Sequence, residues 1–244
     1  MSFEITDRIP KPTLARITGG VYLLFIVTSV LADALGHIGL GNAQQVYGSL
    51  TTDAGAFRLA LVTAFTSTFF FLLAAWGLFV LLRTVNRDLA LLFLLLNAVG
   101  VAIHCASMLQ LLAAMQVIDP GSGLEAAQGQ SLALAAIGVY RAGFVTAQLF
   151  FGTWLFPLGY LVIRSGFLPR LLGVLLLLDG VAELIWFLQA FLLPAYPAIK
   201  TPGTFVSLLA EVGLALWLLV RGVKDKPVEA SPSPTRTGTG ATRR

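Results

Sequence analysis

The chain has 244 residues, of which 57% are hydrophobic and only 11% carry a charged side chain. Soluble domains carry about 25% charged residues, and the mean hydropathy of this chain is +0.85, so the composition excludes a soluble globular protein. The formal net charge of +4 comes from residues outside the apolar stretches, and no basic stripe interrupts those stretches. This pattern predicts a polytopic membrane protein and excludes a nucleic-acid partner.

Six apolar stretches are long enough to cross a bilayer, since about 20 consecutive apolar residues span its hydrocarbon core as a helix. We expect these helices at about residues 15–35, 56–82, 89–118, 125–163, 169–193 and 203–220. The segment 37–55 is too polar to cross, and we interpret it as a connecting loop that can hold a short helix at the membrane interface. The sequence therefore predicts an all-α bundle of six transmembrane helices.

Turn residues separate the later predicted helices. Residues 119–123 (DPGSG) form a turn cluster, and residues 194–197 (PAYP) form another. Pro157 predicts a kink inside the fourth helix, and Gly166 and Pro169 end that helix. The length of the fourth stretch predicts that the helix protrudes from the outer face of the membrane at its start.

The basic residues orient the chain, because positively charged loops stay in the cytoplasm. Thirteen of the sixteen Lys and Arg residues fall at one end of the predicted bundle, and the exceptions are Arg58, Arg141 and Lys200. We therefore expect both termini in the cytoplasm. The tail is rich in Ser, Pro, Thr, Gly and Arg and has no apolar face to bury. The predicted parts are a cytoplasmic N-terminal segment at 1–14, a six-helix transmembrane domain at 15–222 and a disordered cytoplasmic tail at 223–244.

Residue types that build redox and metal sites are absent or scattered. Cys105 is the only cysteine, which excludes an internal disulfide and a C-x-x-C motif. The two histidines, His37 and His104, are expected at different depths, which argues against a bis-His haem. No H-E-x-x-H, G-x-S-x-G or P-loop motif occurs, and no lysine lies within a predicted span, so a retinal Schiff base is excluded. We predict neither a cofactor nor a metal site.

Ionisable side chains inside the predicted spans are the candidates for function, because they are costly in lipid and should face the bundle interior. Asp179 and Glu183 lie four residues apart in the fifth helix and therefore share one face. At about 1.5 Å of rise per residue, these two acids and Glu211 are expected near the membrane midplane. Asp33 and His104 are expected in the outer half, where His104 would hydrogen-bond a neighbouring helix.

Each candidate has a structural interpretation beside the functional one. The three acids near the midplane either fix helix packing or carry protons. Asp33 is either a polar helix end or the ion-pair partner of Arg58. Arg141 either forms a structural ion pair or anchors a ligand. Trp154 and Trp186 either fill the core or line an apolar pocket beside the acids.

Eight short motifs, taken together and in this order, resemble the bacterial integral-membrane family called domain of unknown function 4386. They are ARITGGVY (15–22), FRL (57–59), VNRDLAL (85–91), AQLFFG (147–152), LGY (158–160), RSGFLPR (164–170), LPAYP (193–197) and EVGLALWLL (211–219). The resemblance covers about residues 14–222 and implies a six-helix membrane protein, but no activity. It implies a shared role for Glu211, whereas Asp179 and Glu183 replace the Gly, Leu and Tyr of the family pattern.

Three functions are open at this point. A small transporter or binding protein for an apolar or amphipathic solute would use Asp179, Glu183 and Glu211 as proton carriers, with Arg141 as counter-ion. A membrane-embedded enzyme acting on a lipid or isoprenoid would use Asp179 or Glu183 as a general acid, with aromatic faces stabilising a cation. A structural or accessory subunit would use its polar residues only to hold helices together.

The expected partners are membrane lipids around the bundle, an apolar or amphipathic small molecule within it and, in a homo-oligomer, further copies of the chain. The expected location is the cell membrane of a bacterium, with several passes through it. The sequence does not decide between an enzyme and a protein without catalytic activity.

Overall fold

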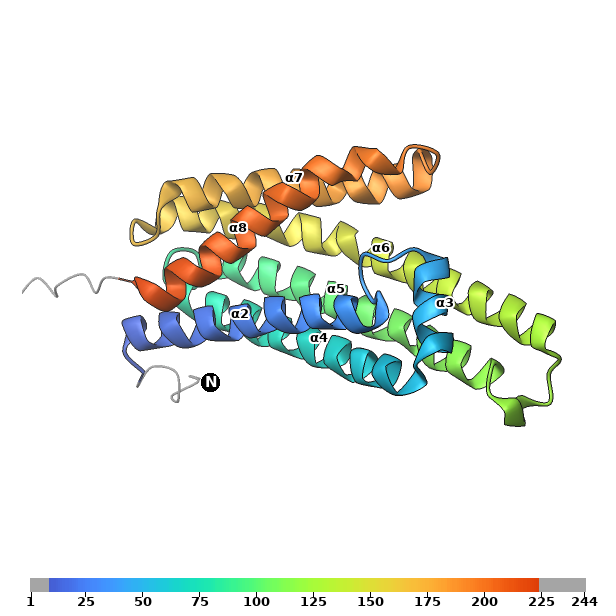
Figure 1. Cartoon of the computed structure of the whole chain (residues 1–244). Coiled ribbons are helices and arrows are strands. Elements are labelled where there is room, and N and C mark those ends of the chain that lie inside the picture. The colour runs from blue at the N-terminus through green and yellow to red at the C-terminus, as the bar shows by residue number, and fades with distance from the viewer. Residues whose placement is uncertain (1–8, 224–244) are drawn as a thin grey trace, which may run out of the picture.

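The computed structural model describes residues 9–223, which are helical along most of their length (Figure 1). The six longest helices are α2 (Lys11–Gly36), α4 (Ala54–Leu82), α5 (Arg87–Val117), α6 (Ala126–Ser165), α7 (Arg170–Leu192) and α8 (Thr201–Val220). Each of them is long and apolar enough to cross a membrane. This confirms the predicted all-α bundle of six spanning helices.

The first helix begins earlier than predicted. α2 starts at Lys11 rather than at residue 15, with Pro10 at its N-cap and Pro12 in its first turn. Proline is well placed there, because the first N–H groups of a helix have no partner within the helix. Residues 11–14 therefore belong to the helix. The predicted tail lies outside the described residues, apart from Val223.

The polar segment between α2 and α4 contains a short helix, α3 (Ala43–Thr52), as predicted. α2 ends where His37 adopts a left-handed backbone with a φ of 54°. A capping box then starts α3. The amide of Gln45 donates to the side chain of Asn42, and the amide of Asn42 donates to the side chain of Gln45. Figure 1 shows α3 running across the direction of the long helices.

The start of α2 and the end of α8 lie at the same end of the bundle (Figure 1), as six spans require. At the opposite end, which we call the outer end, α5 and α6 extend past the other helices and are joined through η1 (Pro120–Ser122). α6 has 40 residues and continues past Pro157 to Ser165, so its length agrees with the predicted protrusion. The assignment of the outer end to the outside of the cell stays a prediction.

The six long helices form a closed ring, in which each packs against the next in the order α2, α4, α5, α6, α7, α8 and α2 again. The contact between α8 and α2 closes the ring. A Cβ atom on Gly19 of α2 would lie 2.7 Å from the carbonyl oxygen of Ala215 on α8, so the two backbones touch. A Cβ atom on Gly152 of α6 would likewise lie 3.0 Å from the carbonyl oxygen of Gly180 on α7. Small residues at such crossings allow close helix packing in a membrane.

We expect Gly19→Ala to destabilise the bundle, because the added methyl group would collide with the backbone of α8. Overpacking of a close contact costs about 1–3 kcal/mol, and it should lower the midpoint of thermal unfolding of the purified protein in detergent. Gly138→Ala in α6 is the matched control, since a Cβ atom there meets nothing within 4 Å. Equal midpoints for the two variants would contradict the role of Gly19 in closing the ring.

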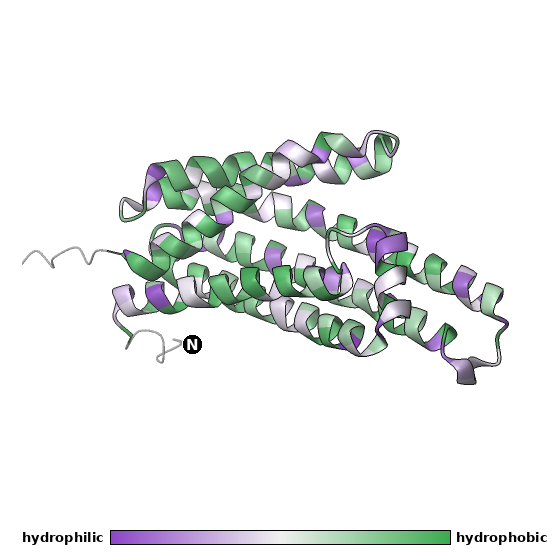
Figure 2. Ribbon diagram, viewed as in Figure 1, coloured by the Kyte–Doolittle hydropathy of each residue, from purple (hydrophilic) through white to green (hydrophobic). Residues whose placement is uncertain are grey.

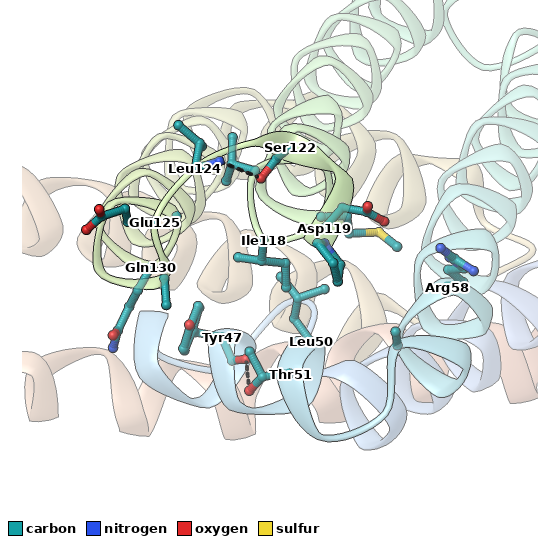
Figure 3. Close-up of a pocket in the computed structure, with 16 residues that line it drawn as sticks. Tyr47, Leu50, Thr51, Arg58, Ile118, Asp119, Ser122, Leu124, Glu125 and Gln130 are labelled. Carbon is teal, nitrogen blue, oxygen red and sulfur yellow. Dashed lines mark hydrogen bonds between the residues drawn. The ribbon is translucent and has the colours of Figure 1, made fainter.

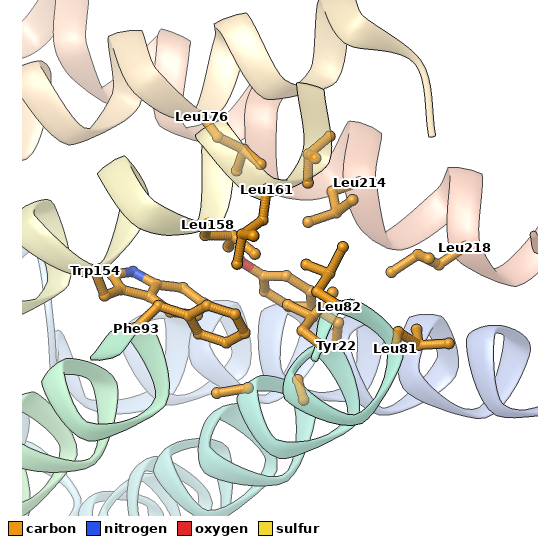
Figure 4. Close-up of a cluster of buried hydrophobic side chains, with 14 of the residues drawn as sticks. Tyr22, Leu81, Leu82, Phe93, Trp154, Leu158, Leu161, Leu176, Leu214 and Leu218 are labelled. Carbon is orange, nitrogen blue, oxygen red and sulfur yellow. The ribbon is translucent and has the colours of Figure 1, made fainter. Parts of the chain in front are cut away.

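Buried apolar side chains form two clusters within the bundle. The larger cluster joins all six long helices and includes Tyr22, Phe93, Trp154 and Leu214 (Figure 4). The smaller cluster packs α3, through residues such as Val46, against its neighbours at the outer end. The long helices are mainly hydrophobic along their length (Figure 2). Many of their exposed side chains are large and apolar, which suits contact with lipid chains.

Candidate functional site

A cavity of about 430 Å³ lies inside the ring and receives side chains from all six long helices and from the loop 38–40. Aromatic residues form much of its wall: Phe25, Phe71, Phe144, Phe151, Trp154 and Trp186. Asp33, Glu183 and Glu211 are its charged lining residues, and no Lys or Arg within residues 9–223 lines it. Sites for small molecules have volumes of about 300–1,000 Å³, so the cavity is large enough for a ligand.

Two of the predicted acids meet at a serine of the neighbouring helix. The hydroxyl oxygen of Ser207 on α8 lies 2.5 Å from Asp179 Oδ1 and 3.1 Å from Glu183 Oε1, both on α7. Asp179 is buried, with an exposed fraction of 1%. The second oxygens, Asp179 Oδ2 and Glu183 Oε2, are buried and have no hydrogen-bond partner in the described part of the chain. The prediction that Asp179 and Glu183 share one helix face is thus met.

The Ser207 hydroxyl cannot satisfy all of its neighbours, because a serine has only one proton to donate. Its oxygen also lies 3.1 Å from the carbonyl oxygen of Gly203, so it faces three acceptors. It can donate to one of them. A further hydrogen bond to a carboxyl group requires that this carboxyl group carries a proton and donates it to the serine oxygen. Both carboxyl groups can therefore be hydrogen-bonded to Ser207 only when one of them carries a proton.

Glu211 joins this group from α8. The hydroxyl of Tyr22 on α2 donates to Glu211 Oε1 at 3.2 Å, and Tyr22 itself is fully buried. Asp179, Glu183 and Glu211 lie close enough together that a charge on one acts on the others. The hydrogen-bond donors to these three carboxyl groups within residues 9–223 are hydroxyl groups and not cations.

Two ring nitrogens on the cavity wall also have no partner among the residues described. Trp154 has an exposed fraction of 0% and an unpartnered Nε1, and His104 has a buried, unpartnered Nε2. The imidazole of His104 packs edge-on against Phe144, with ring centroids 4.9 Å apart, in place of the expected interhelical hydrogen bond at Nε2. Both predicted residues line the cavity.

The predicted outer-half residues Asp33 and Arg141 hold the loop that follows α2. The amide of Leu40 donates to Asp33 Oδ1 at 3.0 Å, and Arg141 Nη1 donates to the carbonyl oxygen of Gly41. Asp33 is therefore a polar helix end. Arg141 does not line the cavity, and its Nη1 donates to a backbone carbonyl, so the described structure does not place it beside the predicted proton carriers.

The remaining basic residues of the outer end lie outside the cavity. Lys200, in the short helix η2 (Pro197–Lys200), places Nζ 4.6 Å from the centroid of the Trp186 ring, a cation–π contact. Arg58 is exposed and lines a different pocket, of about 480 Å³, between α3 and the outer ends of α5 and α6 (Figure 3). Arg58 thus lies at a different pocket, and the described structure shows no ion pair between Arg58 and Asp33.

The arrangement of the acids also bears on metal binding. Within residues 9–223, no three His, Cys, Asp or Glu side chains are placed so that they could hold a metal ion together. The acid group can instead accept, hold and release protons.

Comparison with known proteins places the chain in a family. The family described as Domain of unknown function (DUF4386) matches residues 17–222. This protein belongs to that family. An uncharacterised protein of the archaeon Archaeoglobus fulgidus is similar to it, with 28% identity over 161 residues, which are 65% of this chain and 80% of the relative. No solved structure matches the chain.

The motifs that resemble the DUF4386 pattern meet in space. Tyr22, in the first motif, donates to Glu211, in the last motif, although 189 positions separate them. Gly19 of the first motif packs against Ala215 of the last. Glu211 therefore belongs to the contact that closes the ring as well as to the cavity wall. The first and last motifs thus hold α2 and α8 together.

Ser207 was not among the residues predicted for the site of this DUF4386 protein, although it lies at its centre. A signal was present, since Ser207 precedes Glu211 by four residues and so shares its helix face. Serine is common at helix contacts in membranes, so the residue type alone did not mark the position. Its importance depends on the rotation of α8 toward α7.

Proposed function

We propose that this DUF4386 protein is a small membrane transporter or binding protein for an amphipathic solute, with Asp179, Glu183 and Glu211 as its proton carriers. The observation that supports the proposal is an aromatic cavity whose charged lining is acidic and whose inner acids have only hydroxyl partners. A carboxyl group in such a place can release or bind a proton when a solute enters or leaves.

The cavity also reaches the surface of the bundle. Three of its lining residues, Val30 of α2, Leu40 of the loop and Leu208 of α8, have exposed fractions of 62%, 54% and 54%. A solute could therefore enter between α2 and α8 or at the outer end. The opening at the outer end favours a binding and transport site over the alternative of an enzyme for a lipid or isoprenoid, because such an enzyme would need a cavity that excludes water.

A purely structural role is supported less well. A subunit whose polar groups only join helices should have them mutually hydrogen-bonded and should enclose no cavity of ligand size. Here Asp179 Oδ2, Glu183 Oε2 and Trp154 Nε1 are buried without partners within the described chain. Unsatisfied groups of this kind are costly for packing alone, which favours a function for them.

We place the protein in the cell membrane of a bacterium, with both termini in the cytoplasm. The distribution of basic residues supports this orientation. Membrane lipids contact the apolar outer surface, and a homo-oligomer remains part of the proposal. With this orientation the loop 38–40 and the rim of the cavity face the outside of the cell.

The proposal is tested with the full chain in liposomes that enclose a pH-sensitive dye. Neutral, cationic and anionic amphipathic solutes are added outside, and we expect one class to move protons across the membrane. Glu183→Gln should reduce this movement to that of empty liposomes, because an amide cannot release a proton. Glu125→Gln, at an exposed position before α6, should behave like the wild type. Proton movement at the wild-type rate in Glu183→Gln, or none with any solute in the wild type, would contradict the proposal.

A further inference from the structure

We propose that the ligand of the central cavity is an amphipathic organic monocation, bound with its charge at Glu183 and Glu211 and its apolar body against the aromatic wall. This inference rests on the proposed function and specifies its solute class. It follows from the sign of the lining charges, from the placement of the aromatic rings and from the number of protons that the hydrogen bonds at Ser207 require.

The charges that line the cavity favour a cation. Glu183, Glu211 and Asp33 line it, whereas Lys200 and Arg141 do not. Lys200 contacts the ring of Trp186 and Arg141 donates to a backbone carbonyl, so both are already engaged. An anionic ligand would meet acids without a compensating cation in the lining, and like charges in a buried site repel strongly.

The aromatic wall can hold the apolar part of such a cation. Phe25 and Phe71 stack with ring centroids 4.3 Å apart, and Trp154 stands edge-on to Phe71 at 5.2 Å with an interplanar angle of 88°. Ring faces attract a desolvated cation. Lys200 already makes this contact with Trp186, another lining residue. The wall therefore combines apolar area with sites that favour positive charge.

Unpartnered polar atoms add a requirement for the ligand. Trp154 is fully buried, lines the cavity and has an indole N–H without a partner in the described structure. Its N–H can only donate a hydrogen bond, so a cation that also carries an ether, carbonyl or hydroxyl oxygen would satisfy it. His104 Nε2 lines the same cavity and can bind a second polar atom.

The Ser207 network sets the charge of the ligand. Both carboxyl groups are hydrogen-bonded to Ser207 when the network holds one proton beyond that of the serine hydroxyl, on Asp179 or Glu183. When a monocation arrives, the carboxyl O–H bond breaks, the proton leaves to water and the carboxylate pairs with the cation. The cation brings one positive charge and the released proton removes one, so the net charge of the site does not change. A ligand with a single positive charge therefore matches the proton that it replaces.

The exchange predicts that protons and cation compete. The ionisable groups around Asp179 and Glu183 are Tyr22 of α2, Glu211 of α8 and, at longer range, Lys200 of η2. Asp33 of α2 and His104 of α5 line the same cavity. None of the α4 residues that line the cavity (Ala64, Ser67, Thr68 and Phe71) is ionisable, and the guanidinium of Arg141 on α6 donates to the carbonyl oxygen of Gly41. The affinity for the cation should therefore increase as the pH rises from acidic values, because a smaller fraction of the carboxyl groups is then protonated.

The test uses tetraphenylphosphonium and tetraphenylborate, which have closely similar shapes and opposite charges, with triphenylphosphine oxide as a neutral probe. Binding to the purified full chain in detergent is measured by isothermal titration calorimetry at acidic and alkaline pH. We expect tetraphenylphosphonium to bind with release of about one proton per cation and more tightly at alkaline pH. Tetraphenylborate should not bind.

Two variants locate the charge. Glu183→Gln should weaken tetraphenylphosphonium binding about 10–100-fold, the range for losing an interaction with a charged group, and should remove the proton release. Glu183→Asp keeps the charge and should retain part of the affinity, and Glu125→Gln should match the wild type. Size-exclusion profiles and thermal unfolding check that the variants are folded. If Glu183→Gln does not fold, the comparison of the three probes on the wild type still tests whether the cavity prefers a cation.

The outcomes separate the two proposals. Equal or tighter binding of the borate or the neutral probe would overturn the inference. Equal affinity of the wild type and of folded Glu183→Gln for tetraphenylphosphonium would also overturn it. If the neutral probe binds and moves protons in liposomes while the phosphonium does not, the proposed function stands and the cation class is wrong. If no probe binds and no solute moves protons, both proposals fail.

Discussion

Replacing Trp154 with alanine is expected to cause a large loss of stability. The indole is fully buried and packs edge-on against Phe71 at 5.2 Å and against Phe93 at 6.1 Å. It also belongs to the cluster that joins all six long helices (Figure 4). Truncation of a buried Trp costs about 3–5 kcal/mol, because packing is lost and a void remains.

The measurement is the midpoint of thermal unfolding of purified wild-type and variant proteins in the same detergent. Trp76→Ala is the matched control, since Trp76 lies on α4 with an exposed fraction of 42% and faces outward from the ring. Trp154→Phe keeps an aromatic ring but removes the indole N–H, so it separates the contribution of ring packing from that of the N–H group. A midpoint for Trp154→Ala that equals that of Trp76→Ala would show that α4, α5 and α6 do not pack around this ring.

Ser207→Ala should have the second large effect, on both stability and proton movement. The alanine removes the hydroxyl that faces Asp179 Oδ1 and Glu183 Oε1. Asp179 then loses its hydrogen-bond donor within the described chain while it stays buried. Each buried polar group left unsatisfied costs about 1–3 kcal/mol, so we expect lower stability and a clear loss of solute-driven proton movement.

Ser207→Thr and Ser131→Ala are the controls for this effect. Threonine keeps the hydroxyl and should retain much of the proton movement, whereas Ser131 is exposed on α6 and its loss should be silent. Stability is followed by thermal unfolding and proton movement by the enclosed pH dye. Wild-type values of both quantities in Ser207→Ala would show that the serine does not connect the two acids.

The six spans were predictable because hydrophobic length is a local property. Runs such as 56–82 and 203–220 in the sequence correspond to α4 (Ala54–Leu82) and α8 (Thr201–Val220), with shifts of about two residues at their starts, where helix ends are least defined. The segment 37–55 was interpreted as a connecting loop that can hold a short helix, because it is too polar to cross the membrane, and it contains α3. The shared face of Asp179 and Glu183 followed from helix periodicity alone.

The tertiary structure decided the partners of these residues. Helices in lipid are apolar on most of their surface, so the sequence does not show which side of α8 turns toward α7, and Ser207 was therefore missed. The bond between Tyr22 and Glu211 joins residues 189 positions apart, and it depends on closure of the ring. Arg141 was expected either to form an ion pair or to anchor a ligand, but its guanidinium donates to the carbonyl oxygen of Gly41 and does not line the cavity.

The sequence by itself thus determined that this protein is a six-helix membrane bundle with acids in its interior, because length, hydropathy and helix period are encoded along the chain. Only the tertiary structure decided that the helices close into a ring, that Glu183 and Glu211 line one cavity with Trp154 and that hydroxyl groups bond the acids. The physical reason is that these features depend on the rotation and crossing of helices, which are set by contacts between distant residues.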